Sequence, residues 1–272
     1  MTIPAQDYAQ DYARDGYLCP IDLLSPDEVT DILNVVREDG KRLSGLTRAK
    51  PHLLFPALWD LVHDPRILDQ VETLLGPDIF CFGSSTIEKP AKSDNYVAWH
   101  QDVTFWGMDS ARGATVWIAL SPSVPASGCV KVVPGTHHTQ MQHRDTKDDL
   151  NMLGAREELC DLPGEDQAVA LALQPGQMSI HHPLIVHGSD PNTADYDRIG
   201  FAIRYFEAAS KQDGGSVTLV RGRNLSGMTL EEGPDPTADK PDLMRHAQVL
   251  RRSAKVLRRA KEAHLKQGER DT

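Results

Sequence analysis

The sequence predicts a mainly β fold with flanking α-helices, built on a double-stranded β-helix (jelly roll) core. From Ile79 onward, short runs rich in β-branched and aromatic residues alternate with turns of Pro, Gly, Ser and Asp, which is typical of short strands. Helical periodicity instead gathers before residue 77 and after residue 240. Eight strands with helices to one side favour a jelly roll, an architecture that binds ligands inside its mouth.

We expect one domain over residues 1–272, in three parts. Residues 1–76 form a mainly helical N-terminal support, residues 77–225 the jelly-roll core, and residues 226–272 a linker and a C-terminal helix. The hydrophobic fraction of 40% and the charged fraction of 25% lie near the averages of globular proteins, so the chain has enough apolar material for a core.

Two N-terminal helices have clear signals. Ser25, Pro26 and Glu28 supply a capping serine, a proline at the first helical position and a glutamate three residues after the cap. A second helix opens at Asp64-Pro65 and stops at Gly76. Apolar residues follow at spacings of three and four, namely Val29, Ile32, Leu33 and Val36 in the first helix and Ile67, Leu68, Val71, Leu74 and Leu75 in the second.

The predicted strands lie near residues 79–88, 95–103, 114–121, 128–133, 168–173, 177–187, 198–207 and 216–221. The break from 138 to 167 is long for a loop in a compact domain. We therefore expect it to be a partly helical insertion beside the site or a mobile lid.

The last predicted helix follows a linker at residues 230–241. One face is apolar, with Leu243, Ala247, Leu250, Ala254 and Leu257, and the other is basic, with Arg251, Arg252, Lys255, Arg258, Arg259 and Lys261. The basic face could bind an acidic partner, but we favour a solvated face that balances an acidic body.

Net charge and targeting signals limit the classes of function. The formal charge of −10, from 29 basic and 39 acidic residues, argues against nonspecific binding to nucleic acid or to an anionic membrane. The N-terminus lacks the apolar core of a signal peptide, and no run of about 18 apolar residues occurs. The four cysteines are widely separated without a CxxC pair. We expect a cytoplasmic protein without disulfides, whose partner is small, cationic or another protein.

A candidate metal site begins at Trp99-His100-Gln101-Asp102. Residues two apart on an extended strand point to the same face, so His100 and Asp102 can bind one metal ion. A histidine from a distant strand would complete the two-histidine, one-carboxylate face that is diagnostic of non-haem Fe(II) oxygenases. An HxD pair alone is weak evidence, because it occurs by chance in many proteins.

A second motif supplies that histidine. His187 is followed by Ser189 two residues later and by Arg198 eleven residues later. With the HxD pair, this spacing resembles the phytanoyl-CoA dioxygenase family of Fe(II)- and 2-oxoglutarate-dependent oxygenases. The stretch 115–120 and the turn at 128–137 also look like parts of that family, and the resemblance runs from about residue 12 to about 225.

The resemblance implies a cofactor set and a reaction. Fe(II) would be held by His100, Asp102 and His187, with 2-oxoglutarate and O2 as co-substrates. The reaction would hydroxylate an unactivated C–H bond of a substrate and release succinate and CO2.

The far carboxylate of 2-oxoglutarate needs a fixed planar cation and a nearby hydroxyl group. Arg198 and Ser189 fit these two needs. By resemblance to family members with a TxW at this place, Trp117 would donate its indole hydrogen to the same carboxylate.

Asp102 bears on the type of reaction. A similar subgroup, the syringomycin-type halogenases, has a small residue in place of the metal carboxylate, which lets chloride bind. Since Asp102 is retained, hydroxylation is favoured over halogenation. The substrates of the family range from acyl-CoA thioesters and carrier-bound amino acids to free osmolytes, so the expected substrate is a small metabolite or a natural-product intermediate, either free or linked to a carrier or to CoA.

Histidines close to the second motif compete for the role of metal ligand. His181 and His182 are the main rivals of His187, although neighbouring strand residues face opposite ways, so that at most one of the two looks inward. We favour His187 because it alone has serine at +2 and arginine at +11.

Four residues are candidates for the substrate side: Phe105, Trp106, Arg204 and Lys131. Arg204 shares a strand face with Arg198 but lies about 20 Å along the strand, so both cannot grip one carboxylate. Phe105 and Trp106 follow the metal pair, and a role in the core is equally open to them.

Two functions of other classes remain open. A cupin-like metal-binding protein or isomerase would not use 2-oxoglutarate, and Arg198→Ala would then leave its activity intact. A catalytically dead scaffold would not bind iron, and the intact set of His100, Asp102 and His187 counts against it.

Overall fold

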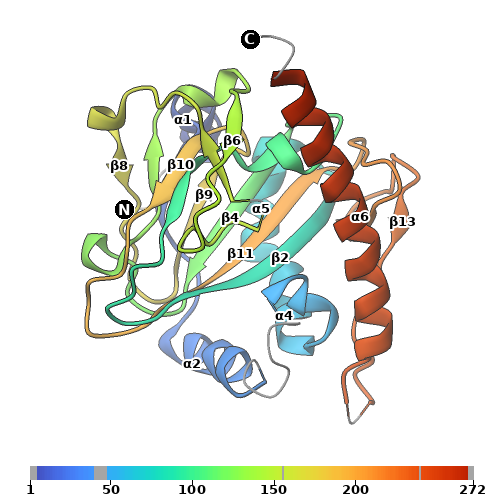
Figure 1. Cartoon of the computed structure of the whole chain (residues 1–272). Helices are drawn as coiled ribbons and strands as arrows, with labels where there is room; N and C mark the ends of the chain where they lie inside the picture. The colour runs from blue at the N-terminus through green and yellow to red at the C-terminus, as the bar shows by residue number, and fades with distance from the viewer. Residues whose placement is uncertain (1–4, 40–47, 155, 239, 269–272) are drawn as a thin grey trace.

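Two β-sheets pack against each other in the computed structural model, which describes residues 5–39, 48–154, 156–238 and 240–268 (Figure 1). The larger sheet has the strand order β1 (Tyr17–Asp22), β9 (Gln177–His181), β4 (Gly113–Ala119), β11 (Arg198–Glu207), β2 (Ile79–Lys89), β12 (Ser216–Arg221) and β13 (Thr229–Leu230). The smaller sheet has the order β3 (Val97–His100), β10 (Val186–Ser189), β5 (Lys131–Val133) and β8 (Val169–Ala170). The predicted double-stranded β-helix with flanking helices is confirmed.

The two faces of the larger sheet have different tasks, which the alternation along β11 makes clear. Its odd-numbered residues from Ile199 to Tyr205 are buried in the main core together with the N-terminal helices. Its even-numbered residues Arg198, Ala202 and Arg204 point to the opposite face and line a cavity. Because its side chains alternate between the two faces of the sheet, β11 contributes residues both to the core and to the cavity.

Four N-terminal helices cover the core face: α1 (Ala5–Asp15), α2 (Pro26–Asn34), α4 (Pro56–Val62) and α5 (Pro65–Leu75). The predicted capping box forms at α2, where the Glu28 amide donates to Ser25 Oγ and the Ser25 amide donates to the Glu28 carboxylate. The region is not wholly helical, because β1 pairs with β9 at the edge of the larger sheet.

The predicted strand at 177–187 is wrong, because the chain breaks there into two strands of different sheets. Pro183 has no amide hydrogen to donate, and the Ile185 amide donates to the His182 carbonyl across a turn. β9 therefore ends at His181 in the larger sheet, and β10 begins at Val186 in the smaller one. This turn carries the chain from one side of the cavity to the other.

The segment 138–167 differs from the predicted partly helical insertion. It forms a hairpin of β6 (His143–Asp145) and β7 (Glu157–Leu159), and its helical content beyond residue 138 is a single 3-10 turn at Glu165–Gln167 among the described residues. Met152 and Leu153, between the two hairpin strands, line the cavity.

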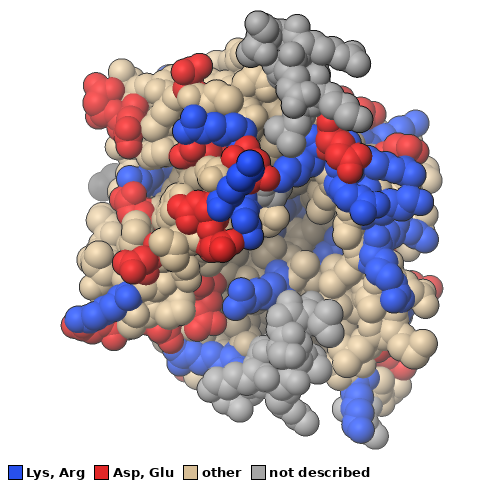
Figure 2. Space-filling view, in the orientation of Figure 1, with Lys and Arg blue, Asp and Glu red and all other residues tan. Residues whose placement is uncertain are grey.

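The C-terminal helix α6 (Leu243–Gly268) forms where the sequence predicts it and runs along one side of the molecule (Figure 1). The face of α6 that packs on the protein differs from the predicted apolar face. His246 and Val256 are buried, whereas Leu243 and Ala254 are exposed. Lys and Arg side chains gather along it (Figure 2). Within the described residues, no helix has the length and apolarity needed to cross a membrane.

Candidate metal centre and co-substrate cavity

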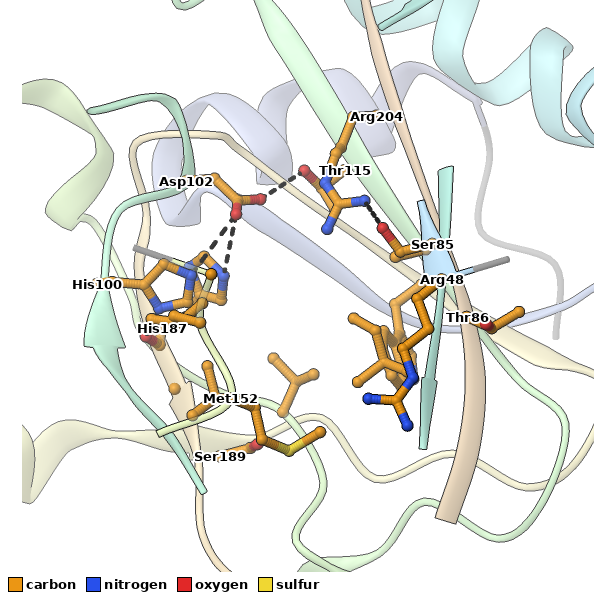
Figure 3. Close-up of a pocket in the computed structure, with 18 of the residues that line it drawn as sticks. Arg48, Ser85, Thr86, His100, Asp102, Thr115, Met152, His187, Ser189 and Arg204 are labelled. Atoms are coloured by element: carbon orange, nitrogen blue, oxygen red, sulfur yellow. Dashed lines mark hydrogen bonds and ion pairs between the residues drawn. The ribbon is translucent and has the colours of Figure 1, made fainter. Parts of the chain in front are cut away.

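A cavity of about 400 Å³ lies between the two sheets and contains the predicted metal ligands (Figure 3). Buried residues that include Ser189 and Arg198 close one end of it, and Arg48 is exposed at its opening. Its size falls within the range of small-molecule sites.

Strand pairing brings the two predicted histidine ligands together. His187 on β10 lies opposite His100 on β3, and their ring centroids are 4.0 Å apart. The Nδ1 atom of His100 hydrogen-bonds the Ala98 carbonyl at 2.9 Å, and Nδ1 of His187 hydrogen-bonds the Ile185 carbonyl at 3.0 Å. Because Nδ1 donates to a carbonyl in each ring, Nε2 is the ring nitrogen that is available to a metal.

Asp102 completes the group from a different local structure than predicted. The expected strand at 95–103 ends at His100, and Asp102 begins a 3-10 turn, η4 (Asp102–Phe105). Gln101 between them keeps extended angles, so the side chains of His100 and Asp102 still point the same way. Gln101 itself points away and is fixed by the carbonyls of Thr139 and Leu184.

The distances fit one metal ion. Asp102 Oδ1 is 3.6 Å from Nε2 of His100 and 3.9 Å from Nε2 of His187, and the three donor groups lie within 4.8 Å of one another. Ligands of one ion at bond lengths of about 2.1 Å lie roughly 3.0 Å apart, so a small inward movement suffices. The other carboxylate oxygen, Oδ2, accepts a hydrogen bond of 3.0 Å from the Thr115 hydroxyl.

Burial and charge prepare these groups as ligands. Burial alone would raise the pKa of Asp102, but the close contact with His100 and the nearby positive charge of Arg204 outweigh it and lower the pKa. Burial, followed by repulsion from His100, lowers the pKa of His187 far below its usual range. The carboxylate is therefore ionised and His187 neutral at neutral pH, as metal binding requires.

The closed end of the cavity holds the residues predicted to bind 2-oxoglutarate. Arg198 is 1% exposed, and its guanidinium carbon lies 4.9 Å from the centroid of the Trp117 ring. The buried Nε of Arg198 and the buried indole nitrogen of Trp117 have no hydrogen-bond partner among the described residues. Two unsatisfied buried donors side by side indicate a missing acceptor.

Lys89 is a residue of this end that the sequence analysis missed. It is fully buried on β2 directly opposite Arg198, and its ammonium group donates to Ser189 Oγ at 2.6 Å and to the Ser189 carbonyl at 3.0 Å. Burial, followed by repulsion from Arg198, lowers the pKa of Lys89 to about 7. Neither cation forms an ion pair with a described carboxylate, so this end is prepared for an anion.

Of the four residues predicted on the substrate side, one lines the metal cavity and three do not. Arg204 lines the cavity, donates to Ser85 Oγ at 2.8 Å and stacks on Trp106. Phe105 and Trp106 instead line a neighbouring cavity beside α6, because the η4 turn directs them away from the metal. Lys131 pairs with Asp190 at 2.7 Å and is absent from the lining of the metal cavity.

His181, the predicted rival ligand, also lines the cavity. Its Nε2 atom is 3.9 Å from Asp102 Oδ2, its ring centroid is 4.8 Å from that of His187, and both of its ring nitrogens are buried without a hydrogen-bond partner among the described residues. It is not one of the three groups whose donor atoms converge.

Comparison with known proteins agrees with this geometry. The ectoine dioxygenase of Bordetella parapertussis is 30% identical over 150 residues, which are 48% of this chain and 49% of the relative, so the chain matches about half the length of that relative. The ectoine dioxygenase of Sphingopyxis alaskensis is 24% identical over 223 residues, covering 71% of this chain and 73% of the relative.

Among solved structures, the apo form of the non-heme monooxygenase ThoJ superposes with a TM-score of 0.81 at 28% identity, covering 94% of this chain and 100% of the other. The sequence model of the phytanoyl-CoA dioxygenase family matches residues 12–200, which include the metal ligands, Ser189 and Arg198. The chain therefore belongs to the phytanoyl-CoA dioxygenase family.

Proposed function

We propose that this protein is an Fe(II)- and 2-oxoglutarate-dependent dioxygenase that hydroxylates a C–H bond of a small molecule. The observation that carries the proposal is the joint placement, in one cavity, of the converging metal-ligand group and a closed end with two buried unpaired donors. Metal centres of this kind occur in proteins of many functions. A metal centre with an anion-binding end beside it is what a dicarboxylate co-substrate that chelates the metal requires.

Each residue has a definite task in this proposal. His100, Asp102 and His187 hold Fe(II) through two imidazole nitrogens and one carboxylate oxygen, which leaves one face of the ion open. Thr115 fixes the rotation of the Asp102 carboxylate through Oδ2, so that Oδ1 faces the histidines.

The closed end holds the co-substrate. Arg198 binds the far carboxylate of 2-oxoglutarate, and the free N–H groups of Arg198 and Trp117 find their acceptor there. Because the Ser189 oxygen already accepts a hydrogen from Lys89, its own hydroxyl hydrogen is free to donate to the same carboxylate. When bound, iron, 2-oxoglutarate and O2 supply the oxidising power, and the protein supplies position and exclusion of water.

A small substrate fits the remaining space, since the cavity of about 400 Å³ must also contain 2-oxoglutarate. Ectoine dioxygenases among the relatives are by name enzymes of a small molecule. Retention of Asp102 as a ligand favours oxygen transfer over halogenation, because the coordination position that chloride would need is occupied.

Anaerobic reconstitution tests the proposal. Addition of Fe(II) and 2-oxoglutarate should give the weak visible charge-transfer band of a chelated keto acid, and His187→Ala should abolish it. His138→Ala, which removes an exposed histidine, is the matched control and should keep the band. An intact protein that forms no band would contradict the proposal.

Oxygen labelling then tests the reaction type with a turned-over substrate. Hydroxylation places one atom of ¹⁸O₂ in succinate and the other in the product. Succinate formation with an unlabelled product would instead indicate desaturation, cyclisation or another reaction without oxygen transfer.

A further inference from the structure

Besides Arg198, two arginines line the cavity without an acidic partner among the described residues. Arg204 and Arg48 line the cavity, and neither forms an ion pair with a described carboxylate. Asp102 and Glu88 are the two carboxylates of the lining. The first is committed to the metal, and the second is exposed at the rim.

Arg204 is held so that part of its guanidinium remains free. Nη1 donates to Ser85 Oγ at 2.8 Å, and the guanidinium carbon lies 5.7 Å from the centroid of the Trp106 ring. These two contacts fix the plane of the group and use one of its five N–H donors. In Figure 3 the guanidinium of Arg204 lies beside Thr115 and Ser85, and Arg48 points into the same cavity.

Arg204 lies next to the metal ligands and not next to the co-substrate end. It pairs across the sheet with Thr115, whose hydroxyl group donates to Asp102. Arg198 is six residues back on the same strand, about 20 Å away between Cα atoms. At that separation one carboxylate group cannot engage both arginines, and Arg198 is the one that stacks on Trp117.

We propose that Arg204, assisted by Arg48, binds an oxyanionic group of the substrate itself, a carboxylate or a phosphate. The inference rests on the proposed function, since it assigns the closed end to 2-oxoglutarate. Only the Thr115 side chain lies between Arg204 and the metal ligand Asp102. The C–H bond that is oxidised therefore lies close to the anionic group of the substrate. The substrate class is a small acid that is oxidised near its acidic group.

The surroundings of the cavity favour the same class. The chain carries a net charge of −10, yet α6 contains eight Lys and Arg residues and one Glu. Its Arg258 and Lys261 line the neighbouring cavity, which shares Gly154 with the metal cavity. A basic wall beside the opening raises the local concentration of anions against an acidic background.

Calorimetric titration of the anaerobic protein loaded with Fe(II) and 2-oxoglutarate tests this assignment. The probes are straight-chain acids from propanoate to octanoate, the matching alkyl phosphates, and the uncharged primary amides. At least one acid or phosphate should bind about tenfold tighter than its amide, because a fixed guanidinium makes a charge-assisted hydrogen bond. The better of the two series identifies the anion.

The variants separate binding by Arg204 from a structural role. Arg204→Gln should lose the preference for acid over amide, Arg204→Lys should retain part of it, and Arg48→Gln should reduce it about threefold. Lys131→Gln, which removes a cation outside the cavity, is the control and should keep it. Arg48 is exposed, so its variant remains informative even if Arg204→Gln does not fold.

The assignment is overturned if Arg204→Gln keeps the acid preference, or if the wild-type protein binds no acid or phosphate better than its amide. Failure of the proposed function is separate, because it appears as a missing charge-transfer band in the wild type. In that case titration of the protein without co-substrate still decides whether the arginines bind an anion.

Discussion

The two ends of the cavity hold their arginines in opposite ways. Arg198 is 1% exposed, stacked on Trp117 and placed opposite the buried Lys89. Arg204 is half-buried and hydrogen-bonded to one side chain, and Arg48 is exposed. A buried cation is costly unless its ligand is always present, whereas a partly hydrated cation is tolerated while the site is empty. The difference indicates an obligatory co-substrate at one end and an exchangeable substrate at the other.

Among substitutions that leave the metal ligands intact, Arg198→Gln should weaken the binding of 2-oxoglutarate at the closed end the most. The variant loses a buried charge-assisted contact, so we expect the affinity for 2-oxoglutarate to fall about a hundredfold. Titration of the charge-transfer band against 2-oxoglutarate measures this. Fe(II) binding should remain, because the arginine contacts no metal ligand in the described structure.

The same titration of Arg204→Gln tests the part of the cavity beside the metal ligands. This substitution should change the affinity for 2-oxoglutarate less than twofold. Equal losses in the two variants would show that both arginines serve the co-substrate, and would remove the distinction between the ends.

Gly200→Ala tests whether Trp117 positions Arg198. A Cβ atom at Gly200 would lie 2.2 Å from the Trp117 ring, so the ring must move away from the guanidinium that stacks on it. We expect roughly tenfold weaker binding of 2-oxoglutarate and a loss of about 1–3 kcal/mol in the free energy of unfolding. The same titration and urea denaturation measure the two effects.

Gly83→Ala is the matched control for the same sheet. A Cβ atom there meets Lys50 at 3.7 Å, an ordinary contact, so co-substrate affinity should stay near that of the wild type. A Gly200→Ala variant that binds 2-oxoglutarate normally would show that the Trp117 ring is not needed for the grip of Arg198.

Lys89 should make the closed end sensitive to pH. Burial lowers the pKa of Lys89 to about 7, so the ammonium is charged below that pH and neutral above it. The charged form attracts the co-substrate, and bound carboxylate in turn raises the lysine pKa. The dissociation constant for 2-oxoglutarate should therefore rise several-fold between roughly pH 6 and pH 8. Lys89→Met should bind more weakly at the lower pH and lose this dependence, and an unchanged pH profile would exclude the role.

The two ends also differ in how far the sequence predicts them. His187, Ser189 and Arg198 follow one another at fixed spacing, so a linear motif identifies them. Lys89 is brought to the same site by the pairing of β2 with β11, in which it lies opposite Arg198. Hydrophobic periodicity does not reveal the strand register between segments more than a hundred residues apart. The lining also includes Arg48 and Met152, which no repeating pattern in the sequence predicts.

Local breaks in regular structure explain the other departures from the predicted fold. An apolar run crosses the turn at Pro183, so the pattern suggested one strand where the chain changes sheets. The 3-10 turn after Gln101 likewise directs Phe105 and Trp106, which the sequence offered either to the substrate side or to the core, into the neighbouring cavity beside α6. In both places the sequence shows which residues are apolar, but not where the chain changes direction.

Lys131→Gln should have the smallest effect, although the sequence placed this lysine on the substrate side. Lys131 pairs with Asp190, whose side chain is 61% exposed, and lies over the Trp99 ring at 5.1 Å. An exposed ion pair contributes about 0–1 kcal/mol, so stability and turnover should both stay close to wild type. Urea denaturation and succinate release measure them. A turnover loss beyond about fivefold at unchanged stability would mean that Lys131 swings into the cavity when substrate binds, and that the open end has a third cation.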